Sequence, residues 1–133
     1  MPPPGKIQNL PVILRGISVC AYPLAAYDFV QQGLAYTVQR VHGPHKKPST
    51  ALHVTGQQLC HGLRELALWQ WGLLARTVLQ RWNITTTMDF GRIVFHLADQ
   101  HVMATTPTDS IHDFDNVYDF ATALEADYRI PLP

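Results

Sequence analysis

The residues of this chain with the greatest potential for chemistry are two cysteines and seven histidines. Cys60 lies next to His61, and a thiolate hydrogen-bonded to an imidazole would form a nucleophilic dyad. Adjacent side chains on a helix point in different directions, so a dyad would need a histidine that the fold brings close to Cys60. The sequence identifies no catalytic residue, and an enzyme built on Cys60 or the histidines is the weakest of three functional hypotheses.

The histidines do not have the spacing of a metal site. His42 and His45 lie three residues apart, but two lysines follow directly and would repel a cation. His96 and His101 lie five residues apart, which does not place them on one face of a helix. The motifs Cys-x-x-Cys and His-Glu-x-x-His do not occur, nor does a phosphate-binding glycine loop. We therefore expect no bound metal and no cofactor.

Charge is unevenly divided along the chain. Residues 1–98 contain nine Lys and Arg residues and three acids, whereas residues 99–133 contain one base and seven acids. The two parts have opposite charge surpluses, although the formal net charge of the whole chain is zero. This division favours docking of the acidic C-terminal part on the basic body, and the alternative is a basic surface that meets an acidic partner.

The composition is that of a single soluble domain. The chain has 133 residues, of which 47% are hydrophobic and 15% charged, and this is enough for one ordinary core. No apolar run reaches the roughly 18 residues that a membrane helix needs. Two cysteines are too few for a disulfide scaffold and suit a reducing compartment. We therefore expect a cytoplasmic protein with no membrane partner.

Four stretches are expected to be helices because their apolar residues recur at intervals of three and four. They are residues 24–41, 57–71, 73–82 and 87–102. Thr55 and Gln58 form a capping-box pattern before the second helix, and Gly72 is placed to end it. The apolar stripes predict one shared core that includes Leu63, Val78, Phe90, Val94 and Leu97, and the stripe of the third helix also includes Leu74.

The acidic segment 109–128 carries regularly spaced apolar residues, which are too many for a solvated tail. They are Phe114, Val117, Phe120 and Leu124. The predicted fold is therefore all-α, a compact bundle of about four main helices with an acidic C-terminal helical strap. Residues 1–22 are expected to be an irregular leader that contains prolines, and residues 23–133 a single helical domain.

Four motifs in this chain are similar to those of a known family. They are AYDFVQQGLAYT (residues 26–37), HVTGQQL (53–59), DFGRIVF (89–95) and DFDNVYDF (113–120). In this order they resemble the Minf-type family of short bacterial proteins, over about residues 22–124. The first 21 residues depart from the helical start of that family. The resemblance implies a bacterial protein but no activity and no catalytic residues, because the family has none assigned.

The first functional hypothesis is a non-catalytic module that binds another protein. On the helix at 24–41, Phe29, Tyr36 and Arg40 lie opposite the face that carries Leu34. In the next helix Leu68 points away from the main apolar face. These helices are apolar on two sides, so the second side is a candidate interaction surface. The oligomeric state does not follow from the sequence.

The second hypothesis is a nucleic-acid or ribosome-associated protein. Three consecutive helices with short turns are compatible with a core that resembles a helix-turn-helix. The candidate phosphate contacts are Arg64, Arg76, Arg81 and Arg92. The third of these helices also presents Asp89 and Asp99, which are unfavourable on a surface that reads bases.

Overall fold

The computed structural model describes residues 22–43, 54–100 and 110–126, and within these residues the fold is all-α. The α-helices are α2 (Leu24–His42), α3 (Gly56–Trp71), α4 (Ala75–Arg81) and α5 (Thr87–Asp99). Three short helical turns are η2 (Gly72–Leu74), η3 (Ile111–Phe114) and η4 (Thr122–Ala126). The predicted bundle of four main helices is confirmed. The expected helix at 73–82 is instead the 3-10 turn η2 followed by the shorter α4.

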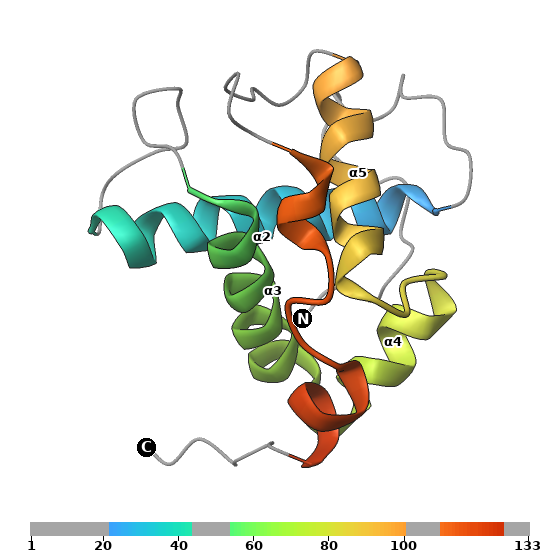
Figure 1. The fold of residues 1–133 in the computed structure, drawn as a ribbon. Coiled ribbons are helices and arrows are strands. Elements are labelled where there is room, and N and C mark those ends of the chain that lie inside the picture. Colours follow the sequence, from blue (N-terminus) through green and yellow to red (C-terminus); the bar gives the residue numbers. More distant parts are fainter. Residues whose placement is uncertain (1–21, 44–53, 101–109, 127–133) are drawn as a thin grey trace.

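The helices are arranged around the C-terminal segment. Figure 1 shows α2 lying across α3 and α5, while the orange-red segment 110–126 runs between α3 and α5 toward the junction of α3 with α4. The predicted leader lies outside the described residues except for Tyr22.

The crossing of α2 and α3 is close because each helix has a glycine there. A methyl group at Gly33 would overlap the side chain of Leu63, and one at Gly62 would overlap the side chain of Thr37. The Thr37 hydroxyl donates a hydrogen bond of 2.7 Å to the Gly33 carbonyl within its own helix. The two backbones can approach because neither glycine has a side chain to keep them apart.

The ends of α3 agree with the sequence prediction. The Gln58 amide donates to the Thr55 hydroxyl at 3.1 Å, and the Thr55 amide donates to the Gln58 side-chain carbonyl at 2.8 Å. The capping box is therefore confirmed. Gly72 ends the helix with a positive φ of 54°, a conformation that favours glycine.

The core has the predicted composition with one exception. Leu63, Phe90, Val94 and Leu97 are buried in one cluster, whereas Val78 is half-buried at its edge. The cluster also includes Phe114, Phe120 and Leu124 from the C-terminal segment. The predicted acidic strap is therefore confirmed as a docked part of the bundle.

The strap is held by apolar packing, hydrogen bonds and charge. Phe114 packs so closely that a methyl group at Gly56 or Gly91 would lie 3.0 Å or 2.8 Å from atoms of its ring. The buried hydroxyl of Thr87 donates to the Phe114 carbonyl at 2.6 Å. Arg76 forms an ion pair of 3.1 Å with Glu125. The aromatic burial contributes most of the free energy, because an exposed ion pair contributes about 0–1 kcal/mol.

Candidate functional site

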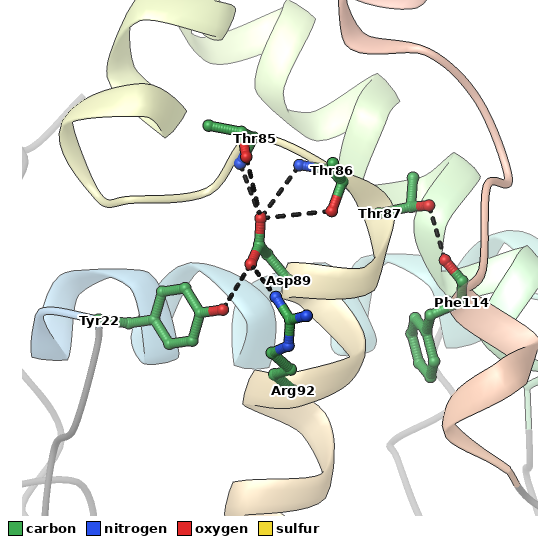
Figure 2. Close-up of polar contacts among 7 residues, drawn as sticks. All are labelled: Tyr22, Thr85, Thr86, Thr87, Asp89, Arg92 and Phe114. Atoms are coloured by element: carbon green, nitrogen blue, oxygen red, sulfur yellow. Dashed lines mark hydrogen bonds and ion pairs between the residues drawn. The ribbon is translucent and has the colours of Figure 1, made fainter.

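A buried carboxylate is the centre of the most connected polar cluster in the described chain. Asp89, in the first turn of α5, is 6% exposed. One of its oxygens accepts from the Tyr22 hydroxyl at 2.6 Å and from the Arg92 guanidinium at 2.8 Å. The other accepts from the backbone amides of Thr85 and Thr86 at 2.9 and 3.1 Å. Figure 2 shows the donors surrounding the carboxylate.

These contacts change the acidity of both buried groups. Burial, together with the hydrogen bond to Asp89, raises the pKa of Tyr22 to about 12. Burial alone would raise the pKa of Asp89, but the Tyr22 hydroxyl, the two amides and Arg92 outweigh it and hold the pKa below its usual range. At neutral pH the cluster therefore contains an ionised carboxylate and a neutral phenol.

The geometry gives the cluster a structural role. The carboxylate caps the N-terminus of α5, where an anion is favoured. Through Tyr22 it also connects that end of α5 to the chain just before α2, whose first residue is Leu24. Since its acceptor oxygens are engaged by these donors, Asp89 is poorly placed to take a proton from a substrate.

Cys60 does not have the surroundings of a nucleophile. Its side chain is fully buried in the core, and burial raises the pKa of the thiol to about 12. The neighbouring His61 is exposed, and its ring lies tilted against that of Tyr118 at a centroid distance of 5.7 Å. The Tyr118 hydroxyl donates to the Cys60 carbonyl at 2.7 Å. A neutral buried thiol packs as an apolar group and is unreactive.

Within the described residues, no group of three His, Cys, Asp or Glu side chains comes together as a metal site would require. The same part of the chain contains no helix that could cross a bilayer.

The predicted interaction face on α2 is not a continuous surface. Phe29 is 2% exposed, because its ring packs against both Trp71 and Trp82 at centroid distances of 5.1 and 5.9 Å. Phe29 is therefore a core residue, and its placement on a partner surface was wrong. The sequence pattern missed this because α2 is covered on two sides within its own fold.

The other predicted members of that face are also engaged. The Tyr36 hydroxyl donates to Glu65 at 2.9 Å, and Arg40 pairs with the same carboxylate at 3.0 Å. Leu68 is half-buried against the core. These contacts link α2 to α3, which leaves Arg40 as the exposed member of the set.

The predicted phosphate contacts do not form a set of free cations. The Arg64 guanidinium donates to the Ala123 carbonyl at 2.8 Å, and Arg76 pairs with Glu125. Arg92 pairs with Asp89. Arg81, at the end of α4, is exposed and has no acidic partner among the described residues. The strap and Asp89 therefore occupy three of the four arginines.

The largest exposed apolar side chains lie together in sequence where α3 passes into α4. Trp69 is 77% exposed, Leu73 61% and Leu74 66%. We call these three residues the apolar corner. The prediction that Leu74 belongs to the core stripe was wrong, because Leu74 lies in η2 before α4 begins. No residue of η2 is buried.

An aromatic cluster adjoins the apolar corner. Trp71, which ends α3 next to η2, contacts the ring of Phe29 and meets Trp82 edge-on at 5.5 Å. Its indole Nε1 is buried and has no hydrogen-bond partner among the described residues. The sequence offers one signal for the apolar corner, the apolar run that continues past the helix break at Gly72.

No protein-family model matches this chain, and no match was found among curated proteins or solved structures. The resemblance to the Minf-type family stays a prediction.

Proposed function

We propose that this protein is a non-catalytic protein–protein interaction module that docks on its partner through the apolar corner. The observation that carries the proposal is the exposure of Trp69, Leu73 and Leu74 beside a well-packed core. Tryptophan is enriched among the residues that dominate binding energy at protein interfaces. Large apolar side chains grouped at one place are typical of a docking surface, whereas single exposed ones need no explanation.

The other two hypotheses have less support. An enzyme based on Cys60 would need an accessible thiolate, but this thiol is buried and its pKa is raised to about 12. Nucleic-acid binding would need free cations, but Arg64, Arg76 and Arg92 are engaged within the fold. We also propose a cytoplasmic location and a relationship to the Minf-type family, and both rest on the sequence features described above.

The proposal is tested by affinity capture with a corner variant and a matched control. The full-length protein and the variant Trp69→Ala/Leu73→Ala are used as baits in the cytosol of the source cell. The control is Val41→Ala, which removes an apolar group that is 42% exposed at the end of α2.

A specific partner should be captured by the wild type and by Val41→Ala, and should be lost with the corner variant. The captured protein is then purified and its direct binding measured, with an expected loss of at least about tenfold for the corner variant. Equal binding to wild type and corner variant would overturn the proposal.

A further inference from the structure

We infer that the partner presents to the apolar corner an amphipathic helix with acidic residues beside its apolar face. This inference rests on the proposed function and specifies the chemistry of the partner. Its starting point is the charge next to the corner. Leu74 directly precedes α4 and has helical backbone angles (φ −84°, ψ −3°), and Arg81, the last residue of α4, follows it by seven residues. The two side chains therefore lie on about the same side of the helix, roughly two turns apart.

In the part of the chain that the structure describes, Arg81 has no partner of opposite charge. We call the exposed side of α4 from the apolar corner to Arg81 the ridge. Arg76 is neutralised by Glu125 at 3.1 Å, whereas Arg81 has no acidic partner among the described residues. Thr77 and Gln80, which lie between the corner and Arg81, are exposed and neutral. The ridge therefore has an apolar end and a positive end, and a complementary ligand has apolar groups followed by a carboxylate.

The length of the ridge suits a helix. Seven residues of helix span about 10 Å, and a partner helix covers the same distance in two turns with apolar residues at i, i+3 and i+4. A carboxylate about two turns from those apolar residues would then meet Arg81.

Charge also argues against an anionic membrane as the occupant. A membrane would meet Arg81, but also the exposed Asp119, which lies just before η4. Since η4 contacts both α3 and α4, this carboxylate would be repelled by an extended negative surface that covers the corner.

The test uses three synthetic peptides of about 18 residues. The first is a helix with leucines on one face and glutamates flanking them. The second has lysine in place of every glutamate, and the third has the composition of the first in an order without an apolar face. Binding is followed by the emission of wild-type protein minus that of Trp69→Phe, which isolates the exposed indole.

The glutamate peptide should shift Trp69 emission to the blue and bind at least about tenfold more tightly than the lysine and scrambled peptides. Arg81→Glu should reverse the preference between the glutamate and lysine peptides. Arg81→Gln should weaken binding of the glutamate peptide, whereas Gln39→Glu, which changes net charge equally at an exposed site on α2, should not.

Three results would overturn the inference. Equal binding of the glutamate and lysine peptides would show that the partner helix needs no acidic residues, while the corner would remain a docking surface. Binding of neither peptide at millimolar concentration would exclude a helix of this chemistry. A Trp69 shift with vesicles of anionic phospholipid but not with the glutamate peptide would assign the corner to a membrane. The capture experiment remains the separate test of the proposed function.

Discussion

Two 3-10 turns of this protein, η3 and η2, carry large apolar side chains. They differ in whether the rest of the fold covers those side chains. Phe114, at the end of η3, is 3% exposed, whereas Leu73 and Leu74 in η2 are 61% and 66% exposed. Phe114 fits against Gly56 and Gly91, where a methyl group would clash with it, and Thr87 binds its carbonyl. No residue of η2 is buried in this way. Burial therefore depends on the surface that receives a side chain and not on its hydrophobicity alone.

The largest loss of stability is expected when the buried ring of Phe114 is removed from the strap. Phe114→Ala removes that ring from the contact between α3 and α5, and we expect it to lower the free energy of unfolding by about 3–5 kcal/mol. Urea denaturation of the full chain measures this loss. Trp69→Ala is the matched control, and its change should stay within about 0.5 kcal/mol because the indole is exposed. Similar losses for the two variants would erase the distinction between strap and corner.

The second-largest loss of stability is expected in the Asp89 cluster. Asp89→Asn removes a charge that accepts four strong hydrogen bonds, and we expect a loss of about 1.5–3 kcal/mol at pH 7. Because the pKa of Asp89 is lowered by folding, its contribution is complete above the ordinary carboxyl pKa of about 4 and is lost as the pH falls through the lower folded value.

The stability difference between wild type and Asp89→Asn should therefore shrink as the pH falls from about 5, above the ordinary carboxyl pKa, through the lower folded value. Denaturant melts across that range measure it. Asp115→Asn, at an exposed site, serves as the control. A difference that grows as the pH falls would show that the carboxylate is not the stabilising form.

Much of the fold follows from the sequence because helix periodicity and caps are local. The capping box at Thr55 and the helix end at Gly72 depend on residues within one turn, and the four helices follow from apolar repeats. The strap was also predictable, because regularly spaced aromatic residues in an acidic segment need a surface to cover them.

The surface residues were harder to predict because exposure depends on neighbours distant in sequence. Phe29 lies opposite one apolar face of α2, yet Trp71 and Trp82 cover it. Leu74 fits the periodicity of the following helix, but it lies in the 3-10 turn η2, of which no residue is buried. The apolar repeat predicts the helix, but it does not show which residues near the helix start reach the core.

A smaller loss of stability is expected when the hydrogen bonds between Thr87 and the strap are removed while its apolar packing is kept. The Thr87 hydroxyl donates to the Phe114 carbonyl at 2.6 Å and accepts from the Val117 amide at 3.1 Å. Thr87→Val keeps the shape but leaves both groups without this partner, and we expect a loss of about 1–2 kcal/mol in urea melts. Thr87→Ser keeps the hydroxyl and should retain most of the stability. An unchanged Thr87→Val variant would show that apolar packing alone positions the strap.

The smallest stability effect is expected at the apolar corner. Leu73→Ser/Leu74→Ser should change the free energy of unfolding by less than about 0.5 kcal/mol, because both side chains are largely exposed. The same variant should bind less of a hydrophobic dye than the wild type. A loss of several kcal/mol would mean that η2 supports the core in the way that η3 does.

Hydroxyl-radical footprinting of the full-length protein, alone and in complex with the captured partner, tests the central claim most directly. In the free protein Trp69 should be labelled readily and Phe114 hardly at all, in line with their exposed fractions of 77% and 3%. In the complex Trp69 should become protected while Val41 remains as reactive as before. Trp69 that is already protected in the free protein, or that stays equally reactive in the complex, would contradict the assignment of the corner as the docking surface.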